Sequence, residues 1–197
     1  MRNMTDFFLK SISMQYIPLD ITAFHEFWSR HPKTKGKAPR VLEYDAVIRA
    51  KSLASLFGKH NALILFYPGK SEKDGISGHY TCMIKHPKGY DYYDSYGDFP
   101  DSAKKYSKQR NRLYNEPGRK NSLIALMKKA HSEGMFIDYS HHKHQSLNPL
   151  IATCGRHCLT RCMRSDLSND EYNKFIKACA KRWGGNVDDA VTRIWRM

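Results

Sequence analysis

Three consecutive segments, beginning with Ala62-Leu-Ile-Leu-Phe-Tyr67, decide the expected fold. The first is an apolar run closed by Pro68-Gly69, which is typical of a buried strand. His79–Lys85 then alternates apolar and polar residues, and Tyr90–Asp94 follows after the turn-forming His86-Pro-Lys-Gly89. Together they predict an antiparallel hairpin beside the first strand.

Helices are expected on both sides of these strands, wherever apolar residues recur at helical spacing. The expected helical ranges are Thr22–His31, Ala46–Phe57, Ser122–Ser132, Cys154–Met163, Ser168–Trp183 (opened by the capping box Ser168-Asn-Asp-Glu171) and Asn186–Trp195. A strand at Met135–Tyr139 would return the chain to the sheet, whereas Gly69–Gly78 is expected to be a polar loop. The expected fold class is α+β, a small mixed β-sheet flanked by helices.

Composition narrows the class of protein. The chain has 197 residues, 41% of them hydrophobic, without an internal repeat or a Gly/Ser linker, and we therefore expect one domain over residues 1–197. Its apolar runs are far shorter than the roughly 20 residues of a membrane span, and its N-terminus lacks the apolar core of a signal peptide. We expect neither membrane insertion nor secretion. The five cysteines are an odd set that favours a reducing compartment over a disulfide framework.

The charge of the chain predicts an anionic partner. Lys and Arg number 33 against 19 Asp and Glu, a formal net charge of +14 that favours polyanions, nucleic acid foremost. The segment Ser102–Lys120 is strongly basic and interleaves Tyr106 and Tyr114. This pattern favours contact with backbone phosphates without base readout. Its candidate DNA-binding residues are Lys104, Lys105, Lys108, Arg110, Arg112, Arg119 and Lys120.

Cys154 is the first candidate for chemistry. It precedes Gly155 and opens a helical pattern, so it is expected at a helix N-terminus, where free N–H groups and the helix dipole favour a thiolate. Such a thiolate is a nucleophile. The alternative is that Cys154 only packs, because cysteine is among the most frequently buried residues.

Partners for a nucleophilic cysteine occur elsewhere in the chain. His79 opens one expected strand and Asp94 closes the next, so both lie at the open end of the hairpin. An imidazole that takes the thiol proton and an acid that orients it are what a cysteine protease needs, together with a donor for the oxyanion. Gln145, in His144-Gln-Ser-Leu-Asn148, precedes Cys154 and is a candidate for that donor.

A metal site is the rival interpretation of the same cysteines. Cys154, Cys158 and Cys162 lie near His157 and the His141-His142-Lys-His144 cluster. On one regular helix, however, this spacing spreads the sulfurs over roughly 11 Å, too far for one zinc ion. We therefore expect no metal, with Cys158 and Cys162 packed in the core.

The series Gly78-His79-Tyr80, Tyr92-Tyr-Asp-Ser-Tyr-Gly97, Gln145 and Thr153-Cys-Gly-Arg-His-Cys158 resembles the adenain-type viral maturation cysteine proteases. That family is related in fold to the ubiquitin-like-protein proteases, and the order His, acid, Gln, Cys is the order of that clan. The resemblance extends from about Asn61 to Cys162, and Tyr80 stands where the family usually has Trp.

The resemblance implies an adenain-like cysteine protease fold with the nucleophile at a helix N-terminus. His79 would be the general base, Asp94 its orienting acid, Cys154 the nucleophile, and Gln145 the oxyanion donor beside the Cys154 backbone N–H. Two assignments stay open. Gln145 lies nine positions before Cys154, more than the spacing in the family, so Asn148 at six positions is a rival donor, and Asp91 is a rival acid.

The expected function is therefore a viral maturation cysteine endopeptidase that cleaves capsid or core precursor proteins. The resemblance implies small, Gly-containing cleavage sites and DNA as a partner and activator. We also expect a monomer in the virion or infected host cell, without a metal or small-molecule cofactor. One alternative is a protease that removes ubiquitin-like modifiers. An alternative of another class is a noncatalytic basic DNA-binding protein.

Overall fold

The computed structural model describes residues 19–30, 38–72, 75–106, 122–148 and 150–196. In them a five-stranded sheet has the order β1-β2-β3-β4-β5. Its strands are β1 (Arg40–Glu43), β2 (Ala62–Glu72), β3 (Gly75–His86), β4 (Gly89–Tyr93) and β5 (Phe136–Tyr139). The β2–β3 and β3–β4 pairs are antiparallel, and both outer pairs are parallel. The sheet is therefore mixed, and the prediction of an α+β fold is confirmed.

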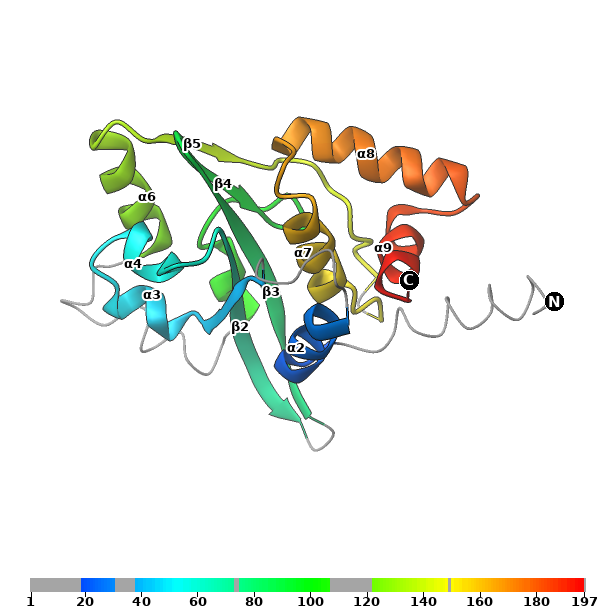
Figure 1. Cartoon of the computed structure of the whole chain (residues 1–197). Helices are drawn as coiled ribbons and strands as arrows, with labels where there is room; N and C mark the ends of the chain where they lie inside the picture. Colours follow the sequence, from blue (N-terminus) through cyan, green and yellow to red (C-terminus); the bar gives the residue numbers. More distant parts are fainter. Residues whose placement is uncertain (1–18, 31–37, 73–74, 107–121, 149, 197) are drawn as a thin grey trace.

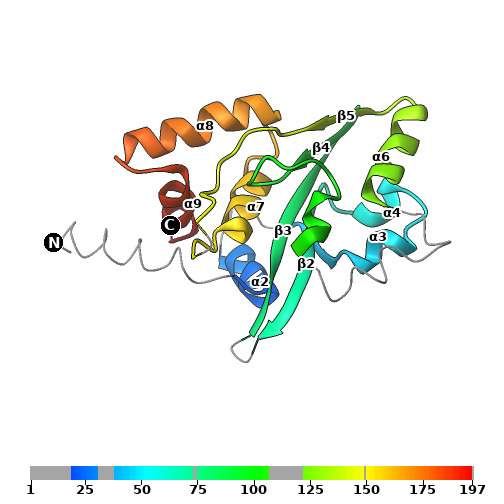
Figure 2. The ribbon, with the colours of Figure 1, turned by 180° about the vertical axis from the view of Figure 1, so that it is seen from behind.

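Helices cover both faces of the sheet (Figure 1; Figure 2 from behind). One face carries α2 (Ile21–Arg30), α7 (Cys154–Met163), α8 (Asn169–Arg182) and α9 (Val187–Arg196). The other carries α3 (Asp45–Arg49), α4 (Leu53–Phe57) and α6 (Leu123–Ser132), with the short 3-10 helix η2 (Ser102–Tyr106) against β2 and β3. None of the described helices is long and apolar enough to cross a membrane.

Strand β2 separates two hydrophobic cores. Leu63, Leu65 and Tyr67 join the core under α3, α4 and α6, whereas Ala62, Ile64 and Phe66 join the core under α2 and α7 to α9. Successive side chains of a strand point to opposite faces, so an uninterrupted apolar run fits a strand that is covered on both sides.

The expected helix Ala46–Phe57 is wrong, because the chain forms two short helices there. Ala50 has an extended backbone (ψ 140°) that ends α3, and Ser52 opens α4 with a capping box to Ser55. Ser favours such caps because its hydroxyl satisfies a free N–H group. The apolar spacing survives the break, since Val47 and Phe57 are both buried.

The expected polar loop Gly69–Gly78 is also wrong. Strands β2 and β3 continue through it, with Ser71 opposite Ile76 after a register irregularity beyond Pro68. Figure 1 shows this end of the hairpin extending past the helices. A strand pair that none of the described helices covers needs no apolar face, and its sequence can therefore lack the alternating pattern of a strand.

The turn after β4 brings the chain against the segment that leads to α7. Gly97 has φ +69°, and a side chain there would place its Cβ 2.7 Å from the His141 carbonyl oxygen. Glycine tolerates both the left-handed backbone and the close approach. Residues 94–97 are thereby held beside residues 140–145, at the end of the sheet where α7 begins.

Candidate active site

His79 and Asp94 form a buried pair at the open end of the hairpin. The β3–β4 ladder pairs Cys82 with Tyr93, so Asp94 leaves β4 one position beyond it, next to the part of β3 that carries His79. His79 Nε2 lies 3.0 Å from Asp94 Oδ1, and the two side chains are 3% and 0% exposed. The predicted pairing of His79 with Asp94 is thus present in the structure.

Tyr96 contacts both members of this pair. Its ring stacks on the His79 imidazole with centroids 5.1 Å apart and planes 17° apart. Its backbone N–H donates to Asp94 Oδ1 at 2.9 Å. The imidazole is therefore held in its plane by a carboxylate at one edge and an aromatic ring over one face.

Cys154 is the first residue of α7, as the helical pattern predicted, and its side chain is partly exposed. Gly155 lets this end of the helix approach α2, because a Cβ at Gly155 would lie 3.2 Å from both Leu19 and Phe24. The thiol therefore sits at a tightly packed helix N-terminus, where the helix dipole favours negative charge.

The Cys154 thiol and the His79 imidazole shift each other's pKa. Burial alone would raise the pKa of Cys154, but a hydrogen bond and the positive charge of His79 outweigh it and lower that pKa. Burial alone would lower the pKa of His79, but Asp94 and Cys154 raise it to about 10. Since His79 Nε2 faces Asp94, Nδ1 is the atom left for the thiol. Both shifts favour a thiolate beside an imidazolium, and the thiolate is the nucleophilic form of a cysteine.

The other cysteines have a different character. Cys82, Cys158 and Cys162 are buried in the core under α7, as expected for Cys158 and Cys162. Burial raises the pKa of all three thiols, that of Cys158 to about 11. Cys179 is partly exposed like Cys154, but burial raises its pKa as well. Within the described ranges, no three His, Cys, Asp or Glu side chains form a group that could hold a metal ion.

Gln145 is buried and attached to the turn that follows Asp94. Its Oε1 accepts a hydrogen bond from the Ser95 hydroxyl at 2.8 Å, and its Nε2 donates to the Tyr96 hydroxyl at 3.1 Å and to the Ile151 carbonyl at 2.9 Å. The rival Asn148 is exposed, and its Oδ1 accepts from the backbone N–H of Leu150 in a local turn. Of the two amides, only Gln145 is bound to the turn that carries Asp94.

Asp91, the rival acid, lies elsewhere. Its Oδ2 accepts from His86 Nε2 and from Arg161 Nη2, each at 3.0 Å. The structure therefore pairs Asp91 with a different histidine, closer to the hairpin turn, and with a cation on α7.

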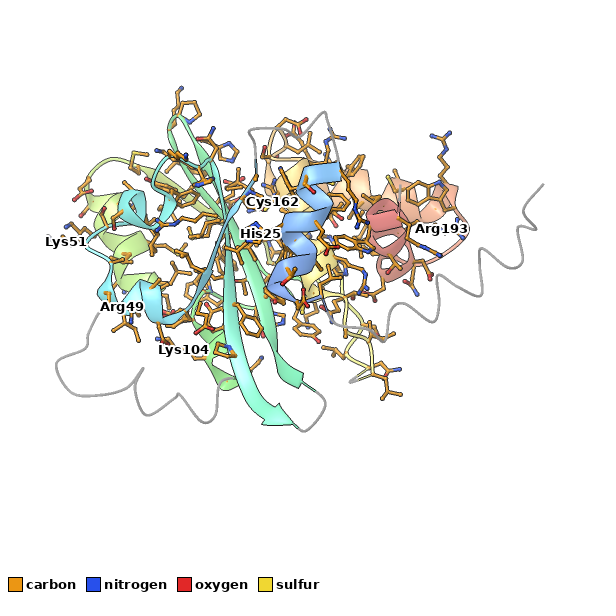
Figure 3. All side chains as sticks on the ribbon, turned by 60° about the horizontal axis from the view of Figure 1, so that its bottom comes forward. His25, Arg49, Lys51, Lys104, Cys162 and Arg193 are labelled. Atoms are coloured by element: carbon orange, nitrogen blue, oxygen red, sulfur yellow. The ribbon has the colours of Figure 1, made fainter. Side chains whose placement is uncertain are left out.

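Only two of the candidate DNA-binding residues lie in the described part of the chain. Lys104 is 3.6 Å from Asp101 and lies over the Tyr44 ring, and Lys105 is 2.5 Å from Asp98. Figure 3 shows Lys104 on the same half of the molecule as Arg49 and Lys51, with Arg193 on the opposite side of the sheet. Lys108, Arg110, Arg112, Arg119 and Lys120 fall outside the described residues.

Sequence reasoning missed several residues that hold these groups in place. Ser95 and Tyr96 belong to the quoted Tyr92–Gly97 motif, so their adjacency to the acid was a usable signal. The sequence gives no comparable signal for the contacts of Asp188. Its partners Thr153 and His157 each lie more than 30 positions away in the chain.

Comparison with known proteins finds a distant relative. No family model matches the chain. The chain is 26% identical over 160 residues to "Uncharacterized protein V9" of Sputnik virophage. The aligned region covers 81% of this chain and 86% of that protein. This similarity indicates a viral protein of virophage type, which belongs to the virion or the infected cell.

Proposed function

We propose that this protein is a cysteine endopeptidase of a virophage-type virus that cleaves capsid or core precursor proteins during maturation. The observation that carries the proposal is the chain of contacts from Cys154 at the N-terminus of α7 to His79, and from His79 Nε2 to Asp94 at 3.0 Å. A nucleophile, a base and an orienting acid in this sequence are the parts that thiol proteolysis requires.

The roles follow from the atoms in contact. The Cys154 thiolate attacks the carbonyl carbon of the scissile peptide bond, and the oxyanion that forms receives hydrogen bonds from the Gln145 side chain and the Cys154 backbone N–H. Imidazolium His79 gives its proton to the leaving amine, which leaves a thioester on Cys154. Neutral His79 then takes a proton from water, which attacks the thioester and releases the acid. Asp94 keeps His79 oriented and stabilises its charged form.

Two observations support the substrate class. The similarity to a virophage protein fits a viral substrate better than a host modifier. The resemblance to adenain-type proteases adds the expectation of small, Gly-containing cleavage sites. The net charge of +14 favours DNA as a partner of the enzyme during maturation.

The thiol of Cys154 provides the test. We expect iodoacetamide to alkylate Cys154 rapidly at pH 6, well below the usual thiol pKa of about 8.5, and His79→Ala to abolish that advantage. Peptide mass spectrometry resolves each cysteine separately, and Cys179, also partly exposed but with a raised pKa, is the internal control. Each measurement is repeated with duplex DNA present, since DNA is the expected activator.

The second half of the test is cleavage. Wild-type protein incubated with a diverse peptide library should cut it at a defined motif, and Cys154→Ala should not. Equal reactivity of Cys154 and Cys179 with and without DNA would overturn the proposal, as would unchanged cleavage by Cys154→Ala. Salt-sensitive DNA binding alongside an unreactive Cys154 would instead favour the noncatalytic DNA-binding protein.

A further inference from the structure

Asp188, in the first turn of α9, joins three segments of the chain that are remote in sequence. Its side chain is buried, and both carboxylate oxygens accept hydrogen bonds. Oδ2 accepts from the backbone N–H of Ser146 at 2.9 Å, and Oδ1 accepts from His157 Nε2 at 2.9 Å and from the Thr153 hydroxyl.

Two of these partners adjoin the proposed oxyanion donors. Ser146 directly follows Gln145, and Thr153 directly precedes Cys154. The backbone N–H groups of His144 and Gln145 both donate to the Ser95 carbonyl at 2.9 Å. Three consecutive amides are therefore fixed, two by the turn after Asp94 and the third by Asp188.

The third partner, His157, extends the connection. The Tyr93 hydroxyl lies 3.0 Å from His144 Nδ1 and 3.3 Å from His157 Nδ1, so it bridges α7 to the residue before Gln145. Burial lowers the pKa of His144 to about 4, and the ring is therefore neutral near pH 7. Burial would raise the pKa of Asp188, but the bonds from His157, Thr153 and Ser146 lower it instead.

We propose that Asp188 is a positioning residue that sets the distance between the Gln145 side chain and the Cys154 backbone N–H, the two donors of the oxyanion site. The inference rests on the proposed function. A carboxylate suits this task because it has two acceptor oxygens and no donor, whereas an amide in its place would present an N–H group to one of three N–H or O–H donors. A donor site displaced by about 1 Å loses much of its effect on the transition state.

The test is a double-mutant cycle on peptide cleavage. We expect Asp188→Ala to lower kcat by about 10-fold to 100-fold, approaching the effect of Gln145→Ala, which removes one oxyanion donor. In the Gln145→Ala background Asp188→Ala should cost much less, because one of the two donors it positions is already gone. The pH profile of Cys154 alkylation should stay that of the wild type, since His79 and Asp94 control the thiolate.

Two further variants separate positioning from loss of folding. Thr153→Val keeps the side-chain volume and removes only the bond to Asp188, so it should lower kcat without lowering the melting temperature to the extent of Asp188→Ala. Asp91→Asn disrupts a comparable buried pair away from the site, and cleavage at a temperature where it is folded should match the wild type.

The outcomes distinguish this inference from the proposed function. An active wild type in which Asp188→Ala has the same effect with and without Gln145 overturns the inference alone. Loss of Cys154 alkylation in Asp188→Ala, in step with loss of cleavage, also overturns it, because the effect is then structural. An unreactive Cys154 in the wild type overturns the proposed function and this inference with it.

Discussion

The hairpin of β3 and β4 carries two histidine–aspartate pairs of the same length in different surroundings. His79 and Asp94 meet at the open end at 3.0 Å, and His86 and Asp91 meet near the turn at 3.0 Å. Asp94 accepts otherwise from a neutral backbone N–H, whereas Asp91 also binds the buried guanidinium of Arg161. A thiol contacts His79, while the His86 side chain is 31% exposed.

Under the proposed function, the difference implies that a histidine next to an aspartate is not by itself a catalytic arrangement. The Asp91 carboxylate is already neutralised by the permanent cation Arg161, and the two form a salt bridge between the sheet and α7. A carboxylate bonded to imidazole and a backbone amide instead stabilises imidazolium beside the thiol. The third partner distinguishes the two pairs, and under the proposed function only the pair of His79 and Asp94 is reactive.

Replacing each histidine with alanine should give the largest difference between the two pairs. We expect His79→Ala to lower kcat/KM for peptide cleavage at least about 10⁴-fold, because it removes the group that activates the nucleophile. His86→Ala should change it less than about twofold. Steady-state kinetics on one fluorogenic peptide measures both, and similar losses in the two variants would contradict the distinction.

Replacing each aspartate with asparagine should separate activity from stability. Asp94→Asn should lower kcat by on the order of 10²–10⁴, since the imidazole loses its orientation and its charge partner. Asp91→Asn should leave kcat unchanged and lower the free energy of unfolding by about 3 kcal/mol, because it leaves Arg161 buried without its anion. Urea denaturation alongside kinetics tests this. A large loss of kcat in Asp91→Asn would reverse the assignment.

The pH dependence of kcat/KM should give the smallest effect, but it should distinguish the two aspartates clearly. The pKa of His79 is about 10, above its ordinary 6.5, so kcat/KM should fall on the alkaline side only as the imidazolium loses its proton near that pH. Removing the negative charge in Asp94→Asn lowers the pKa of His79 and should move that limb down by about one unit or more. Asp91→Asn should leave the limb in place, and an equal shift in both variants would show that both pairs act on His79.

Most of the fold follows from local patterns in the sequence. The strand at Ala62–Tyr67, the helix opened by Ser168 and the helix that begins at Cys154 each depend on apolar spacing or a cap within a few residues. The two wrong predictions concern segments where the local sequence pattern does not match the structure. The Ala46–Phe57 pattern conceals a break at Ala50–Ser52, and the hairpin continues through polar residues beyond the reach of the helices that the structure describes.

The site was less predictable than the fold because its supports are nonlocal. His79, Asp94 and Cys154 became candidates because their chain order and neighbours match a known arrangement. Asp188 carries no such mark, since an acid in the first turn of a helix is commonplace and usually only complements the helix dipole. Its partners Ser146 and Thr153 lie on a segment without regular secondary structure, whose course no periodicity fixes.

The hydrogen bonds that Gln145 makes bear on how the enzyme would distinguish its substrate from the transition state. Both Nε2 hydrogens are already engaged, one by the Ile151 carbonyl and one by the Tyr96 hydroxyl. An arriving neutral carbonyl would exchange one such bond for another of similar strength and gain little. An oxyanion accepts bonds roughly twice as strong, so only the charged intermediate gains from the exchange. A donor occupied in the resting protein would thus contribute to kcat while adding almost nothing to substrate affinity.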